Sequence, residues 1–267
     1  MHDAAHDASP WTLLDPLAEV RCGTLSGRID ISQPGLGLHQ VALGAAPLSA
    51  RLLCITHDDR PERLPSSDAD LHGATTVWPV ADAYVRGSDL VAGYQPTADW
   101  PFSPQIDWRA DVDQATTSSC AALSLYISVQ TQLLDTWPDV NVQSHLEADE
   151  VLYAAPDTRA FQRAKQLLPG EHIFSPATTA SCIVHRFADG KTSYAEIMPA
   201  SDFREVTVRY DAAGVCHTNW HLFADFLEKG VIWRARLHAL LLPRENDIER
   251  AMAFCSTLDQ RPLPLTT

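Results

Sequence analysis

Lysine is almost absent from this 267-residue chain, and several features that would assign a function are missing altogether. The lysines are Lys165, Lys191 and Lys229, so arginine supplies most of the basic charge. Acidic residues outnumber basic ones by 34 to 20, which gives a formal charge of -14. An acidic surface repels phosphate backbones and anionic lipids. We therefore expect neither nucleic-acid binding nor membrane binding.

Targeting and membrane-spanning segments are also lacking. The sequence has no apolar run of about 18 residues, the length that a membrane-spanning helix needs. Residues 1–10 are polar and have no apolar core of a signal peptide, and we expect them to be disordered. The six cysteines lie far apart without a CxxC pair, which is typical of reduced thiols. Together these absences predict a cytoplasmic protein.

Sequence motifs of several enzyme classes do not occur. The chain has no GxGxxG after a strand, no GxxxxGK[ST] and no GxSxG, which excludes dinucleotide, P-loop and ordinary α/β-hydrolase sites. No cysteine has the setting of a nucleophile. His217 and His221 stand four apart, but the third ligand and the glutamate of a zinc-protease pattern are missing. We expect no metal and no cofactor.

A long alternating stretch, Ser119 to Leu133, is the strongest structural signal that is present. From Ala121 on, its odd positions are apolar except for Thr131, and its even positions are polar except for Ala122. Two-residue alternation is the mark of a β-strand with one face buried and the other polar. At about 3.3 Å per residue the strand would span roughly 50 Å, so it could pair with several shorter strands.

Most of the other segments also predict strands that are joined as hairpins. Asp189-Gly190 between two apolar runs is among the best two-residue hairpin turns. Three segments predict helices instead, namely 157–168, 220–228 and 245–255. The predicted fold class is mainly β, a large antiparallel β-sandwich with three or four short peripheral helices.

Residues 11–267 are predicted to form a single domain. Long strands in a chain of this size resemble the supersandwich layout of galactose-mutarotase-like proteins. This resemblance concerns architecture alone, since no motif in the sequence identifies that family or any other.

The polar side of the long strand is the first candidate for a binding surface. We expect the strand 140–146 to be its antiparallel neighbour, because consecutive strands usually pair. The joined face is rich in hydroxyls and amides, which suit hydroxyl-bearing ligands. The alternative is a plain solvated sheet face. The residues of this face are Ser124, Tyr126, Ser128, Gln130, Gln132, Asn141, Gln143, His145 and Glu147.

His145 and Glu147 are candidates for catalysis on that face. They are two residues apart on one predicted strand, so both side chains project the same way. Histidine titrates near neutral pH, and burial can raise the pKa of a glutamate towards it, so the two could act as general acid and base. The surrounding acidic cluster could also bind a divalent cation, or be a surface histidine beside an acidic loop.

Two further groups of residues are candidates for ligand binding. Arg234, Arg236 and His238 would form a basic ladder that binds a carboxylate or phosphate, unless the arginines pair with Glu205 or Asp202. A second group shares one predicted strand face and has the composition of a small-ligand pocket, or of a partly buried core edge. This second group is Trp78, Asp82, Tyr84 and Arg86.

These patterns support three hypotheses of different classes. The first is a β-sandwich protein that binds a small polar, carbohydrate-like or anionic ligand on its polar sheet face. The second is a carbohydrate-active enzyme with epimerase- or mutarotase-like acid/base chemistry, in which Arg86 or Arg236 holds the substrate. The third is a non-enzymatic interaction protein that uses exposed strand edges. The sequence leaves open the choice between enzyme and binding protein, the ligand's identity and the oligomeric state.

Overall fold

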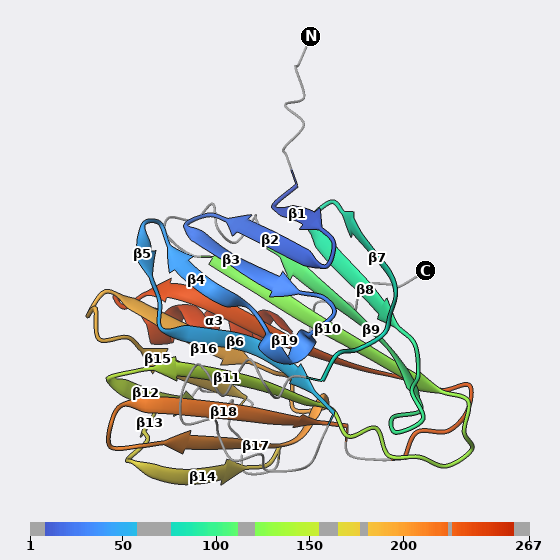
Figure 1. The fold of residues 1–267 in the computed structure, drawn as a ribbon. Helices are drawn as coiled ribbons and strands as arrows, with labels where there is room; N and C mark the ends of the chain where they lie inside the picture. The colour runs from blue at the N-terminus through green and yellow to red at the C-terminus, as the bar shows by residue number, and fades with distance from the viewer. Residues whose placement is uncertain are drawn as a thin grey trace.

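A computed structural model describes residues 9–57, 76–111, 121–154, 165–176, 181–223 and 226–258. Over these ranges the chain is mainly β, with three antiparallel sheets and one α-helix (Figure 1). Most of the predicted disordered N-terminus lies outside the described residues.

The first sheet, here called the N-terminal sheet, is a five-stranded meander. Its strands follow one another in chain order, as the short turns between them require. They are β1 (Trp11–Leu14), β2 (Leu17–Cys22), β3 (Leu25–Asp30), β4 (His39–Leu43) and β5 (Ala46–Pro47).

The second sheet has nine strands and holds the long strand β10 near its middle. Its spatial order is β13-β12-β15-β16-β19-β10-β9-β8-β7. The strands are β7 (Val80–Arg86), β8 (Asp89–Tyr94), β9 (Phe102–Ala110), β10 (Ala121–Thr131), β12 (Glu150–Ala154), β13 (Lys165–Gln166), β15 (Cys182–Arg186), β16 (Thr192–Ile197) and β19 (Ile232–Pro243).

The third sheet has the order β14-β17-β18-β11-β6. Its strands are β6 (Ala50–Thr56), β11 (Asn141–Glu147), β14 (Gly170–Phe174), β17 (Phe203–Tyr210) and β18 (Val215–Leu222). The short 3-10 helix η1 (Pro34–Leu36) contacts β6, and the helix α3 (Asp247–Leu258) packs on β15, β16 and β19.

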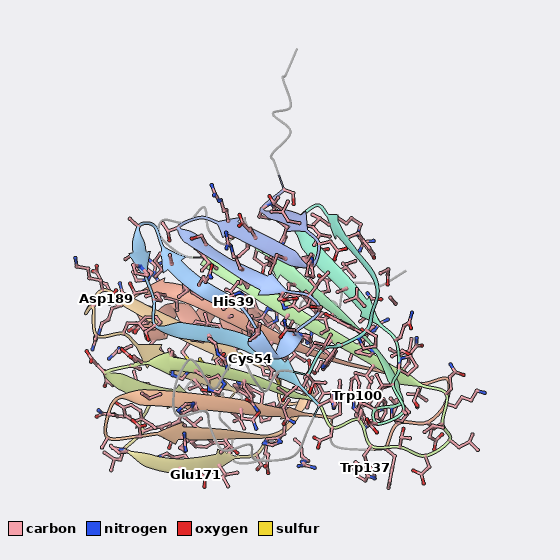
Figure 2. The ribbon with its side chains drawn as sticks, viewed as in Figure 1. His39, Cys54, Trp100, Trp137, Glu171 and Asp189 are labelled. Atoms are coloured by element: carbon pink, nitrogen blue, oxygen red, sulfur yellow. The ribbon has the colours of Figure 1, made fainter. Side chains whose placement is uncertain are left out.

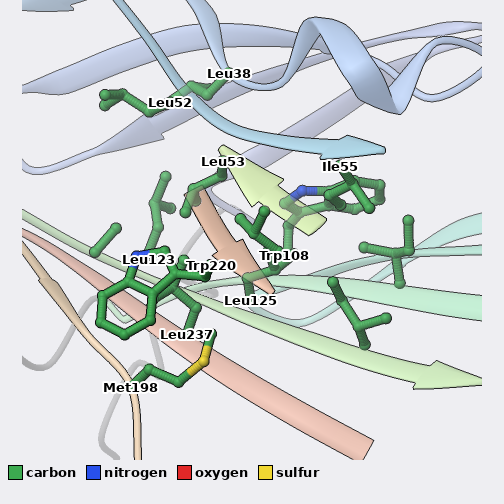
Figure 3. Close-up of a cluster of buried hydrophobic side chains, with 14 of the residues drawn as sticks. Leu38, Leu52, Leu53, Ile55, Trp108, Leu123, Leu125, Met198, Trp220 and Leu237 are labelled. Atoms are coloured by element: carbon green, nitrogen blue, oxygen red, sulfur yellow. The ribbon is translucent and has the colours of Figure 1, made fainter. Parts of the chain in front are cut away.

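The alternation predicted for the long strand is confirmed. Leu123, Leu125, Ile127 and Val129 are buried in the main core, whereas Gln130 is exposed. The core forms between the nine-stranded sheet and the other two sheets, as the close-up in Figure 3 shows. There Leu125, Trp108 and Leu237 of the nine-stranded sheet lie near Leu53, Ile55 and Trp220 of the third sheet.

The prediction of three or four helices is wrong for the described residues, which hold one α-helix. The segment 245–255 is helical, as predicted, and Ala251, Met252 and Phe254 form its buried side. The predicted helix 157–168 lies mostly outside the described residues, and its end forms β13 instead.

The segment 220–228 is the clearest error of secondary structure. It begins inside β18, and Leu227 forms an isolated bridge with Thr136. The reason is that Cys216, Thr218, Trp220 and Leu222 alternate as buried residues. The residues between them are polar and less buried, so the segment alternates as a strand does. This alternation outweighs the helix-like spacing from which a helix was predicted.

The expected pairing between the strands 119–133 and 140–146 is also wrong. β10 pairs with β9 and β19, whereas β11 pairs with β6 and β18 of the third sheet. The chain crosses from one sheet to the other between β10 and β11. One predicted polar face therefore becomes two separate faces on different sheets.

Candidate functional site

The outer face of the nine-stranded sheet gathers most of the ligand-binding residues proposed from the sequence. Ser124 lies opposite His238, and Tyr126 lies opposite Arg236 on β19. Because directly paired residues share a face, these side chains lie with the even positions of β10. The other predicted residues on this face are Asp82, Tyr84, Arg86, Gln130 and Arg234.

Many charges on this outer face are paired within the protein. Arg109 binds both carboxylate oxygens of Asp89, at 2.6 and 2.8 Å. Arg236 donates to Asp202 at 3.0 Å, which is the pairing that the sequence offered as the alternative to ligand binding. These arginines therefore already have carboxylate partners.

Asp107 also lies on the outer face of the nine-stranded sheet, opposite Tyr126. It is buried, its Oδ1 has no hydrogen-bond partner, and burial together with Asp89 raises its pKa to about 7.

Trp78 lies away from Asp82, Tyr84 and Arg86, so it does not share the strand face that holds these three residues. β7 begins only at Val80, and Trp78 is buried in an aromatic cluster with Trp100 and Tyr94. His57 stacks on Trp100 at 4.6 Å between ring centroids, immediately after the end of β6. Figure 2 labels Cys54 on β6 and Trp100 beyond the end of that strand.

The outer face of the third sheet carries a second set of polar residues, which we call the third-sheet polar face. Strand register places them in rows across β6, β11, β18 and β17, with His145 opposite both Arg51 and His217. The face comprises Arg51, Thr56, Asn141, Gln143, His145, Glu205, Thr207, Arg209, His217, Asn219 and His221.

A β-bulge in β6 brings Arg51 to this face. Cys54 pairs with Gln143 and Arg51 pairs with His145, so β6 uses one residue more than β11 over this interval. Leu53 has a φ of 59°, a left-handed conformation that is uncommon for leucine. In a regular strand Arg51 and Cys54 would point to opposite faces. Bulges of this kind commonly re-aim a side chain next to a functional site.

His145 and His217 form the centre of the face. Their Nδ1 atoms lie 2.7 Å apart, a hydrogen-bond distance. Burial, the neighbouring imidazole and the guanidiniums of Arg51 and Arg209 lower the pKa of His145 to about 3. Burial and Arg209 lower the pKa of His217 to about 4. Both imidazoles are therefore neutral at neutral pH.

Several buried polar atoms of this face have no hydrogen-bond partner. Both Nε and Nη1 of Arg51 and the Nε of Arg209 are among them. So are side-chain oxygens of three residues at the other rows, Thr56, Asn141 and Asn219. An unpaired buried polar group costs about 1–3 kcal/mol, so a concentration of them indicates a place where water or a ligand binds.

The two predicted catalytic residues lie on this same face but do not contact each other by hydrogen bonding. His145 bonds to His217, whereas the exposed Glu147 accepts a hydrogen bond from Ser49 at 3.2 Å. Gln143 lies one row away, opposite Asn219. Arg86 and Arg236 lie on the nine-stranded sheet, so neither shares the face with His145.

Sequence reasoning missed Arg51, Arg209 and Asn219. Arg209 and Asn219 could have been found, because Thr207 and Arg209 alternate with buried valines, and His217, Asn219 and His221 alternate along β18. Arg51 could not, because the bulge changes the side to which it points.

Two further tests concern metals and membranes. Among the described residues, no group of three or more His, Cys, Asp or Glu is arranged to hold a metal ion. No helix within those residues is both long and apolar enough to cross a membrane.

Comparisons with known proteins reveal a likeness of fold. No family model matches the chain, and no curated protein matches it in sequence. The solved structure of the Slr1438 protein from Synechocystis sp. PCC 6803 is similar, with a TM-score of 0.53 and 8% identity over 90% of this chain and 99% of that one. At this identity the likeness concerns the fold alone.

Two further solved structures match with lower TM-scores. HI1317 has a TM-score of 0.48 and 7% identity, over 84% of this chain and 91% of its own. The GH36 alpha-galactosidase AgaA from Geobacillus stearothermophilus has a TM-score of 0.46 and 8% identity. The match covers 85% of this chain but 40% of the alpha-galactosidase.

Proposed function

We propose that the third-sheet polar face binds a small, hydroxyl-bearing ligand that also carries an anionic group, such as an acidic carbohydrate derivative. One observation carries this proposal. Arg51 and Arg209 present buried N–H groups without partners on either side of a neutral histidine pair. Guanidinium groups bind carboxylate or phosphate oxygens through paired N–H donors.

The rest of the face supplies groups suited to hydroxyls. Thr56, Asn141 and Asn219 each keep a buried oxygen without a partner, and Gln143 lies two residues after Asn141 on β11 and opposite Asn219. Amide and hydroxyl groups can both donate and accept, which matches sugar hydroxyls.

The proposed architecture is a large β-sandwich of the supersandwich kind. It is supported by the single core that the nine-stranded sheet shares with the other two sheets. A cytoplasmic location remains a prediction from the sequence.

A thermal-shift screen tests the proposed binding. The panel holds neutral sugars, sugar acids, sugar phosphates and inorganic sulfate. A ligand at 100 times its dissociation constant adds about 2.7 kcal/mol, which raises the melting temperature by about 5–10 °C. Arg51→Gln and Arg209→Gln should remove the shift given by anionic members of the panel.

Arg28→Gln is the matched control, because Arg28 pairs with Glu19 on the N-terminal sheet. It should leave the shifts unchanged. If no anionic compound shifts the melting temperature, or if Arg51→Gln leaves the shift intact, the proposed site is wrong.

The hydrogen bond between His145 and His217 favours a second candidate, acid/base catalysis on a carbohydrate. Here His145 with Glu147 would move the proton, and Arg51 or Arg209 would hold the substrate in place of Arg86 or Arg236. Interconversion of sugar anomers, followed by NMR for each sugar that binds, tests this. Enzyme-catalysed exchange lost in His145→Gln supports catalysis, and exchange at the uncatalysed rate contradicts it.

A further inference from the structure

The hydrogen bond between His145 and His217 constrains where their protons lie. The two Nδ1 atoms are 2.7 Å apart, and one of them must carry a hydrogen while the other accepts it. In the uncharged pair the two rings are therefore opposite tautomers. Their Nε2 atoms are then unlike, since one is an acceptor and the other a donor.

The charged groups around the pair come from every neighbouring strand. Arg51 lies opposite His145 on β6, and Arg209 lies opposite His217 on β17. Glu147 follows on β11, and Glu171 on β14 lies opposite Arg209. Asp211 is close enough to raise the pKa of His217, but burial and Arg209 outweigh it.

This environment holds the pair uncharged, and part of the effect comes from the two guanidiniums. The guanidiniums of Arg51 and Arg209 lower the pKa of His145 by repulsion, in addition to the effect of burial. An anion bound to the guanidiniums would offset that repulsion and would itself attract a positive imidazole. Both effects raise the proton affinity of the pair.

We propose that the His145–His217 pair acts as one proton acceptor, which takes up a single proton from solvent when an anion binds between Arg51 and Arg209. The inference rests on the proposed function, because it needs an anion at that position. The added proton turns one imidazole into a donor at both nitrogens. The site then offers a third positive charge beside the two arginines.

Linkage makes this proton visible in the affinity. If binding takes up one proton, the anion binds more tightly as the pH falls. The dissociation constant then rises up to tenfold for each unit by which the pH increases. This holds over the pH range in which the pair is charged in the complex and uncharged in the free protein.

Inorganic sulfate is the appropriate probe, because its charge does not change over the range in which histidine titrates. Calorimetry of sulfate binding to the full chain, in two buffers of different ionisation enthalpy, counts the protons taken up. We expect uptake approaching one proton in mildly acidic solution, and weaker binding as the pH rises. Imidazole C–H resonances in NMR should shift towards the protonated form when sulfate is added.

His145→Gln and His217→Gln test the pair itself, because glutamine can hydrogen-bond but does not titrate near neutral pH. Each variant should bind sulfate without proton uptake. His172→Gln is the control, since His172 lies on the edge strand β14 and its Nε2 is hydrogen-bonded to the carbonyl oxygen of Leu168. It should behave as the unaltered protein does.

The outcomes separate this inference from the proposed function. Sulfate that binds in an Arg51-dependent manner, with no proton uptake and no change of affinity with pH, overturns the inference and leaves the binding site intact. Absence of Arg51-dependent binding overturns both. If a glutamine variant fails to fold, the calorimetry and NMR of the unaltered chain still decide the question.

Discussion

The indole Nε1 of Trp220 donates a hydrogen bond to Oε2 of Glu196 at 2.8 Å, although both side chains are completely buried. Tyr194 donates to the other carboxylate oxygen at 3.1 Å. Glu196 comes from the nine-stranded sheet and Trp220 from the third sheet, so the bond joins the two across the core. It lies on the inner side of the strand β18, whose outer side carries His217 and Asn219.

Glu196 should make stability depend on pH. Burial raises its pKa in the folded chain, so the unfolded chain releases this proton more readily. The contribution of Glu196 is therefore fully present below about pH 4.3, its unfolded pKa, and declines as the pH rises towards the folded pKa, by up to about 1.4 kcal/mol per unit. Urea unfolding of Glu196→Gln should lack this decline. The exposed Glu171→Gln should retain it, and equal slopes in all three proteins would contradict the assignment.

The buried histidines should make the protein sensitive to acid, with the opposite sign. The pKa values of His145 and His185 are lowered to about 3 by burial. The pKa of histidine in the unfolded chain is about 6.5. The stability that each histidine contributes is therefore present above this pH and is lost as the pH falls towards the pKa of the folded chain. In acid-unfolding curves His145→Gln should move the midpoint to lower pH. His172→Gln serves as the control, and a midpoint that does not differ from it would contradict the prediction.

Gly37 should be required for the bulge in β6. Its φ is +60°, and an added Cβ would collide with the carbonyl oxygen of Leu52 and with Cys54. An unfavourable φ alone costs about 1 kcal/mol, and Gly37→Ala should destabilise the fold by more than this. Gly87→Ala measures the cost of the unfavourable φ alone, because Gly87 has the same φ but open space around it. Equal urea midpoints for the two variants would show that the close approach has no cost.

Asp247 should fasten α3 to the nine-stranded sheet. Its carboxylate accepts two hydrogen bonds from Arg186, at 2.8 and 2.9 Å, and one from Ser193 at 2.6 Å. Asp247→Asn should cost about 3 kcal/mol, because it leaves the partly buried Arg186 without much of its counter-charge. Amide hydrogen exchange should accelerate in α3 first. Glu249→Gln, an exposed change on the same helix, should leave exchange unaltered.

Local sequence patterns predicted most of the strands but not their partners. The alternation of β10 and the hairpin at Asp189-Gly190 are properties of neighbouring residues, and the structure confirms both, although four residues, 188–191, form the turn instead of two. The assignment of β10 and β11 to different sheets depends on which distant strands each one meets. The hairpin rule gave the wrong neighbour because the loop between them crosses between the sheets.

The candidate site shows the same division. His145 and Gln143 could be placed on a polar face from their spacing alone. Their neighbours Arg51 and Arg209 come from strands far away in the sequence, so only the strand register shows the contact. The position of Arg51 depends in addition on the left-handed φ of Leu53. The backbone preferences of leucine do not predict this conformation.

The extra residue in β6 makes this strand unusually intolerant of a shorter sequence. Deleting one residue between Arg51 and Cys54 would restore regular pairing with β11, and Arg51 would remain opposite His145 because Arg51 and Cys54 would then be two apart. It would, however, remove one of the adjacent residues Leu52 and Leu53, both of which are buried in the core. Any protein that shares this arrangement should thus keep two apolar residues between the positions of Arg51 and Cys54.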